Sequence, residues 1–205
     1  MVRAGLRTGG MMLGALFCAF GLIPAQQPRP ASQFAESGQV LVAGHSTPYL
    51  IRHLPVSSFP ELPAAVQALL NRRGCLIPQT YAAHHPENVI HASLERAGSS
   101  DWAVLCSANG KVSLLVFFSS APGELAELAS DFETQRLQPH DPTGVLGFNW
   151  GIDPASPAQV REAQTGMERR PPRLDHDALA DSVVERHTVY HFYARSAWTL
   201  VGMPE

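Results

Sequence analysis

Histidine side chains are the groups in this sequence best suited to chemistry, and there are nine of them among 205 residues. His187 and His191 fall in a run typical of a β-strand, and alternation along a strand places both on the same face. Asp175, His176 and Asp177 precede them and offer further donors of the kind that zinc accepts. One hypothesis is a divalent metal site built from His187, His191 and a carboxylate of Asp175 or Asp177. The alternative is a pair of exposed or hydrogen-bonded histidines on a sheet face.

A second histidine group, His84 and His85, is followed by Pro86 and His91. Proline disfavours helix in the residue before it, so we expect a surface turn here, ahead of a strand over residues 89–94. The sequence contains no G-x-S-x-G, no H-E-x-x-H, no S-x-x-K with its companion motifs and no glycine-rich phosphate loop. Nucleophilic catalysis therefore has little support.

The first 25 residues are typical of a signal peptide. Arg3 and Arg7 precede an apolar stretch of 13 residues, 11–23, and Ala25 offers a cleavage site. That stretch is shorter than the roughly 20 apolar residues that cross a bilayer. Cys18 would allow lipidation, but Phe17 stands where a small residue is expected. We predict a secreted or periplasmic protein, with a flexible spacer over residues 26–38.

Cys75 and Cys106 are the two cysteines that remain once Cys18 is removed with the signal peptide. An even count in an oxidising compartment predicts a disulfide between them. The loop that they close has about 32 residues, for which the chain-entropy model gives about 3 to 4 kcal/mol. Two free buried thiols, or one catalytic thiol, are the alternatives.

Composition indicates a folded and mildly acidic chain. Apolar residues make up 45% and charged residues 16% of the sequence, and 15 basic residues stand against 18 acidic ones. No basic face is implied, so nucleic acid is a poor candidate as a partner. Lys111 is the single lysine, which we interpret as the coding bias of a GC-rich bacterium.

The clearest β-signal is a hairpin formed by residues 102–107 and 112–118. Asn109 and Gly110 between them favour a two-residue turn in which both positions have positive φ. That turn places Cys106 opposite Ser113, and because both faces of the hairpin are apolar we expect it to be central and covered on both sides.

Other elements follow from apolar periodicity and capping residues. We expect an extended segment or a loose hairpin of residues 40–42 and 49–51, strands over 144–151, 183–193 and 197–201, and an exposed loop over 166–177. We expect helices over 58–74, 122–132 and 157–165. Together these predict a single α+β domain over residues 39–205, with an antiparallel meander sheet packed by two or three short helices.

Residues 93–104, S-L-E-R-A-G-S-S-D-W-A-V, resemble the D-F-N-G-D-G-x-x-D-L-A-V hairpin of FG-GAP or integrin-like repeats. The resemblance implies a strand, a tight turn and a strand, with Gly98 and Asp101 retained. That family's loop binds calcium through oxygen side chains, and here Glu95 and Asp101 keep a carboxylate. Four further segments, among them D-W-A-V-L-C-S, look like exported bacterial proteins of unassigned function.

These observations favour a secreted or periplasmic, non-catalytic binding module without a cofactor, whose partner is an unknown protein or envelope component. The alternative is a metal-dependent hydrolase that uses the histidine and carboxylate residues named above. Neither hypothesis involves nucleic acid or a transmembrane segment.

Overall fold

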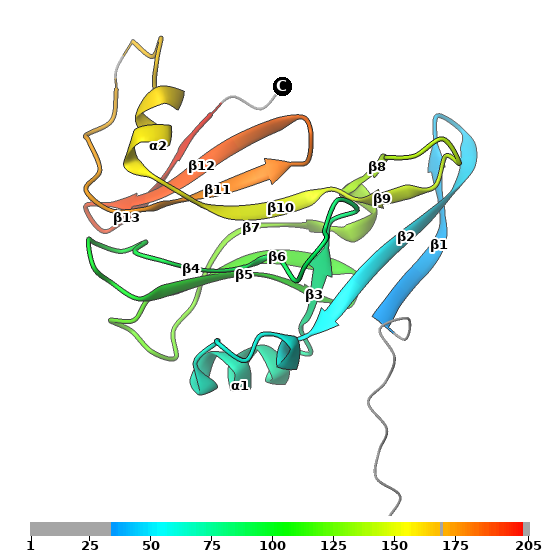
Figure 1. The fold of residues 1–205 in the computed structure, drawn as a ribbon, viewed down its shortest axis with the longest axis horizontal. Coiled ribbons are helices and arrows are strands. Elements are labelled where there is room, and N and C mark those ends of the chain that lie inside the picture. The colour runs from blue at the N-terminus through cyan, green and yellow to red at the C-terminus, as the bar shows by residue number, and fades with distance from the viewer. Residues whose placement is uncertain (1–33, 169, 203–205) are drawn as a thin grey trace, which may run out of the picture.

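A computed structural model of the protein describes residues 34–168 and 170–202. The expected signal peptide, Cys18 and most of the expected spacer lie outside these residues. The described part is mainly β-structure in one domain, with two α-helices (Figure 1). The first half consists of β1 (Ala35–Val42), β2 (His45–Pro55), the 3-10 helix η2 (Val56–Ser58), α1 (Ala64–Arg72), β3 (Leu76–Gln79), β4 (Val89–Ala92), β5 (Asp101–Ala108) and β6 (Lys111–Phe117). The second half consists of β7 (Ala126–Phe132), the 3-10 helix η3 (Glu133–Gln135), β8 (Leu137–Pro139), β9 (Leu146–Phe148), β10 (Trp150–Ala155), α2 (Pro157–Ala163), β11 (Ala178–Val183), β12 (His187–Ala194) and β13 (Ala197–Val201).

These strands form two sheets. The larger sheet has nine strands in the order β7-β6-β5-β3-β2-β9-β8, with β1 paired to β2 and β4 paired to β5. The smaller sheet has four strands in the order β10-β11-β12-β13. Among the described pairings only β2 with β9 is parallel. No helix in the described part of the chain is long and apolar enough to span a membrane.

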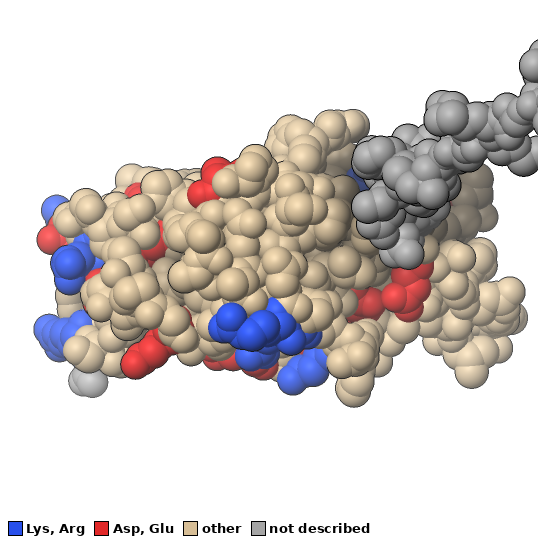
Figure 2. Space-filling model, turned by 90° about the horizontal axis from the view of Figure 1, so that it is seen from below, with Lys and Arg blue, Asp and Glu red and all other residues tan. Residues whose placement is uncertain are grey.

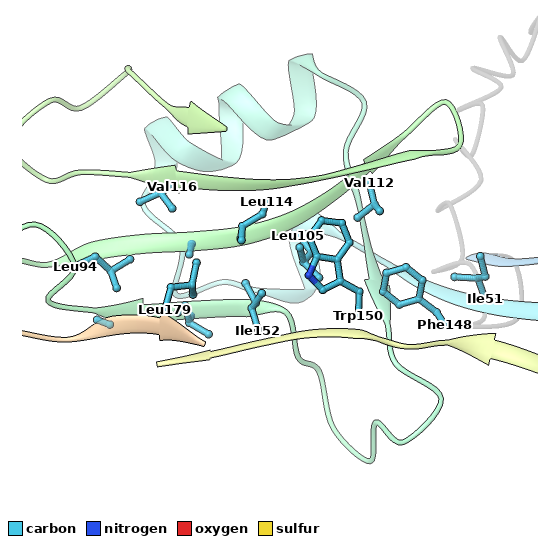
Figure 3. Close-up of a cluster of buried hydrophobic side chains, with 13 residues drawn as sticks. Ile51, Leu94, Leu105, Val112, Leu114, Val116, Phe148, Trp150, Ile152 and Leu179 are labelled. Carbon is cyan, nitrogen blue, oxygen red and sulfur yellow. The ribbon is translucent and has the colours of Figure 1, made fainter. Parts of the chain in front are cut away.

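The two sheets pack face to face over the main core. Leu105, Leu114 and Val116 of the larger sheet meet Trp150 and the side chains beside it on β9, β10 and β11 (Figure 3). Trp150 and Leu114 are fully excluded from solvent. Burial of such large apolar side chains is the main favourable contribution to folding.

A second core lies on the other face of β5 and β6, where α1 packs against the sheet. The Sγ atoms of Cys75 and Cys106 lie within this core at disulfide distance, and their Cα atoms are 5.1 Å apart. Two cores on opposite faces explain why every residue from Val112 to Phe117 is buried.

Several local predictions are confirmed. Asn109 and Gly110 have φ of 54° and 74° and close the hairpin of β5 and β6, with Cys106 opposite Ser113. The predicted helix over 157–165 is α2, whose Ser156 forms a capping box with Gln159. The expected hairpin near residues 40–51 is longer than predicted, because β1 begins at Ala35, before the expected end of the spacer.

The helix predicted over 122–132 is wrong, because most of that segment forms strand β7. The register of β7 on β6 shifts between Leu114 and Leu115, which leaves Leu128 as an extra, bulged residue. Leu128 and Ala129 are both half-buried as a result, and this break in alternation imitates a helical stripe. Phe132, which the helix would have packed, is 64% exposed.

Two other boundaries differ from the predictions. The first helix begins at Ala64 and not near Ser58, since Pro63 occupies its N-cap and disfavours helical φ and ψ in the residue before it. The strand predicted over 183–193 is divided by a turn in which Glu185 has φ of 60°. No glycine or asparagine marks that turn in the sequence.

Candidate functional site

The predicted metal site at His187 and His191 is not assembled. The two residues are four positions apart on β12, about 13 Å along the strand, and their imidazole nitrogens do not converge on a common point with a third ligand from the described residues. The His191 imidazole instead lies 3.0 Å from Asp181 Oδ2, and both side chains are buried. His187 Nδ1 is buried without a hydrogen-bond partner among the described residues.

Asp181 is at the centre of a closed network between the two sheets. Its Oδ1 atom accepts a hydrogen bond of 2.6 Å from the Trp150 indole, while Oδ2 faces His191. The Arg136 guanidinium stacks over the Trp150 ring, 4.1 Å from its centroid. Both carboxylate oxygens therefore have partners, and the group has the properties of a structural polar cluster.

The carboxylates predicted to join the histidines lie elsewhere. Asp175 is exposed in the loop before β11, and Asp177 Oδ2 accepts a hydrogen bond of 3.1 Å from the Ser93 backbone N–H. Asp177 thus connects that loop to the segment after β4. None of the four predicted metal ligands shares a site with another.

Asp101 organises the loop that resembles a calcium-binding hairpin. Oδ2 accepts N–H hydrogen bonds from Leu94 and Glu95 and one from the Ser99 hydroxyl, and Oδ1 accepts the N–H and hydroxyl of Ser119. Burial opposes ionisation, but these donors outweigh it and hold the pKa of Asp101 below its usual value. Glu95 points to the Ser120 hydroxyl, 2.8 Å away. Both carboxylates thus hold the loop through hydrogen bonds from protein donors.

A different group brings metal-ligating atoms together. Glu36 on β1, His53 on β2 and Glu133 in η3 each place one ligand atom within 4.8 Å of the other two, and this is the one such group found among the described residues. His53 Nε2 lies 2.6 Å from Glu133 Oε1, and both side chains are at least 96% buried. Glu36 is exposed and forms the solvent side of the group.

The pKa values of Tyr49 and Glu133 are shifted by their surroundings in this cluster. Burial raises the pKa of Tyr49, and the charges of Glu36 and Glu133 raise it further. The Tyr49 hydroxyl donates to Glu36 Oε1 over 3.3 Å. For Glu133, burial alone would raise the pKa, but the neighbouring His53 imidazole and Ser107 hydroxyl outweigh it and lower the pKa. The Ser107 hydroxyl does not reach hydrogen-bond geometry, so Glu133 Oε2 is buried without a hydrogen-bond partner among the described residues.

Two adjoining hollows lie along β2, and His53 of the cluster is among the residues that line the first. One has a volume of about 400 Å³ and is lined by Leu50, Leu54, His84 and His85 among others. The second, of about 260 Å³, is lined by Tyr81 and His140, and the two share Leu50, Arg52 and Gln79. Together they form a groove, here called the β2 groove, with apolar and imidazole walls.

Arg52 stands where the two hollows of the β2 groove meet. Its Nη2 atom donates to the carbonyl oxygens of Thr80 and Ala83, over 3.1 and 2.9 Å. These bonds hold the guanidinium in place and fix the loop after β3. No acidic side chain of the described residues forms an ion pair with Arg52. Asp141 also lines the second hollow but forms no ion pair with Arg52, so the groove contains a fixed guanidinium that no acidic side chain of the described residues pairs with.

Sequence reasoning missed both the cluster and the groove. Glu36, His53 and Glu133 have no motif spacing, because 80 positions separate the histidine from its buried partner. One signal was present: His53 alternates with Tyr49 and Ile51 along β2, so it occupies an inward position of a strand. Comparison of the chain with protein-family models, curated proteins and solved structures finds no match.

Proposed function

We propose that the chain is an exported, non-catalytic α+β binding module that holds an acidic, partly apolar peptide segment of an envelope protein in the β2 groove. The observation that carries the proposal is the fixed guanidinium of Arg52 in that groove. Arg52 is exposed and forms no ion pair with the described residues, so it is free to bind an anionic ligand, and a guanidinium matches the geometry of a carboxylate.

The walls of the groove supply the rest of the recognition. Leu50 is 45% exposed, so burying it under a ligand gains apolar contact. His84, His85 and His140 add donors, and they add positive charge when protonated. An apolar surface with a few polar groups that converge on it is the usual composition of a binding site.

An extended peptide fits this shape better than a compact molecule does. The two hollows share three lining residues, so a ligand that occupies both must pass over Leu50, Arg52 and Gln79. A peptide could place a carboxylate at Arg52 and one apolar side chain in each of the two hollows. Export of the module is supported by the cysteine pair at disulfide distance, because disulfides persist in oxidising compartments.

The test uses a short peptide with a glutamate between two leucines, and its glutamine analogue. We expect NMR shifts at Leu50 and Tyr81 with the acidic peptide and binding at least about tenfold weaker with the neutral one, equivalent to about 1.4 kcal/mol. Arg52→Gln should remove this preference, whereas Arg72→Gln, on the distant helix α1, should keep it. Equal binding of both peptides, or a preference that survives Arg52→Gln, contradicts the proposal.

A further inference from the structure

We propose that Glu36, His53 and Glu133 form a binding site for a divalent transition metal ion, zinc in particular. The three ligand atoms already lie within 4.8 Å of one another. In a tetrahedral zinc site with bonds of about 2.0 to 2.1 Å, ligand atoms are roughly 3.3 Å apart. Binding thus requires the exposed side chain of Glu36 to move about 1 to 2 Å inward and His53 Nε2 and Glu133 Oε1, now 2.6 Å apart, to separate by roughly 0.7 Å.

His53 is prepared to act as a ligand by the contact on its other nitrogen. Nδ1 lies 3.2 Å from the carbonyl oxygen of Phe34, which can only accept a hydrogen bond. With the proton of the neutral ring on Nδ1, Nε2 carries the lone pair and points into the cluster. A backbone carbonyl behind a metal-ligating histidine is the usual way in which proteins fix its tautomer and ring orientation.

Glu133 provides the observation that calls for a cation. It is 98% buried, its Oε1 faces His53 Nε2 at 2.6 Å, and its Oε2 has no hydrogen-bond partner among the described residues. An unpartnered, buried carboxylate oxygen is costly. Without metal, one proton shared between Nε2 and Oε1 satisfies half of this carboxylate. A metal ion bound to Nε2 and to the carboxylate would replace that proton and give Glu133 the missing partner.

Glu36 completes the set and leaves the site open. Its exposure gives an ion a path from solvent, and the hydroxyl of Tyr49 orients its carboxylate. Three protein ligands leave a fourth position for water. One imidazole and two carboxylates suit zinc better than calcium, which prefers six to eight oxygen ligands.

The experiment measures zinc binding by calorimetry and native mass spectrometry. The protein is produced from the full-length gene, without a histidine tag, and is treated with a chelator before zinc chloride is added. We expect one zinc ion per chain, with binding at least about tenfold weaker in Glu36→Gln and lost in His53→Gln. X-ray absorption spectroscopy at the zinc edge should show one imidazole among ligands that lie about 2.0 to 2.2 Å from the ion.

Two controls keep the result decisive. Glu61→Gln changes an exposed glutamate outside the cluster, and His84→Gln with His85→Gln removes the exposed histidine pair. Both variants should bind zinc as the unaltered protein does. Should His53→Gln fail to fold, Glu36→Gln decides, since Glu36 is exposed. The proposal is overturned if no zinc binds, if Glu36→Gln binds it with full affinity, or if the His84/His85 variant loses it.

Discussion

Two histidine–carboxylate pairs are buried in the described part of the chain, and they differ in what surrounds the carboxylate. His191 faces Asp181 at 3.0 Å, and the second oxygen of Asp181 accepts the Trp150 indole N–H. His53 faces Glu133 at 2.6 Å, but no group of residues 34–168 or 170–202 forms a hydrogen bond with the second oxygen of Glu133. Both oxygens of Asp181 therefore have a partner, whereas only one oxygen of Glu133 does.

This difference separates a structural pair from a candidate binding site. The Asp181 pair lies between the two sheets, on a strand position opposite Ile152 of the main core, and has no third ligand. The Glu133 pair has a third ligand in Glu36, which faces solvent. The two pairs therefore contain similar residue types. Only the Glu133 pair has an exposed third ligand and a carboxylate oxygen without a partner among the described residues, and we expect metal binding at that pair alone.

The largest expected effect is the loss of stability on removing Asp181. Asp181→Ala leaves the Trp150 indole and the His191 imidazole without an acceptor between the sheets, which should lower the free energy of unfolding by about 3 to 5 kcal/mol. Urea unfolding measures this change. Asp175→Ala, at an exposed carboxylate, should change stability by less than about 0.5 kcal/mol. Similar values for the two variants would contradict the structural role of Asp181.

Zinc should stabilise the protein through the Glu133 pair and not through the Asp181 pair. At a free zinc concentration 100 times the dissociation constant, the free energy of unfolding should rise by about 2.7 kcal/mol. His191→Gln should keep this increment, and Glu36→Gln, with binding about tenfold weaker, should lose about half of it at the same zinc concentration. Urea unfolding with and without zinc gives both numbers. If His191→Gln abolished the stabilisation by zinc, the metal would bind at the Asp181 pair, which would contradict the proposal.

The acid side of the stability profile should depend on Glu133. Its pKa is lowered in the folded protein, so its contribution is complete above the unfolded value of about 4.3 and is lost as the pH falls through the folded value. Glu133→Gln should therefore show a shallower loss of stability below about pH 4 than the unaltered protein. Asp101, whose pKa is also lowered, keeps its own contribution in both. Identical slopes in urea unfolding from pH 6 to pH 3 would contradict this expectation.

The smallest effect is expected from Glu36→Gln without metal. The residue is exposed, so stability should change by less than about 0.5 kcal/mol. The same variant should lower the pKa of Tyr49, since part of its elevation comes from the charge of Glu36, while the part caused by burial remains. An ultraviolet titration of the tyrosines at alkaline pH measures the shift. An unchanged titration would show that Glu36 does not act on Tyr49.

Surface charge does not reveal either site. On the face drawn in Figure 2, basic and acidic side chains occur in small separate groups among many uncharged residues. Each candidate site depends on one charged side chain. Arg52 is held by backbone carbonyl oxygens, and Glu133 has one oxygen without a partner among the described residues. Net charge and composition therefore carry little information about where a ligand binds.

Local elements could be predicted from the sequence where the signal is carried by adjacent residues. Asn109 and Gly110 adopt positive φ at little cost, and they set the register that places Cys106 opposite Ser113. Strand β7 could not be predicted in the same way, because its bulge at Leu128 exists only against the register of β6.

The cluster of Glu36, His53 and Glu133 could not be predicted either, because its residues meet only through the arrangement of the strands. His187 and His191 share a strand face, as alternation required, yet the length of the strand separates them and Asp181 binds one of them. His53 and Glu133 meet although they are 80 positions apart.

By itself, the sequence determined the turns, the alternation of the central strands and the pairing of two cysteines, since each depends on local backbone preference or on a simple count. The tertiary structure decided which histidine meets which carboxylate and whether that carboxylate has a second partner. Those properties arise from the order of strands in the sheets, which is set by apolar burial summed over the whole domain and not by any short segment.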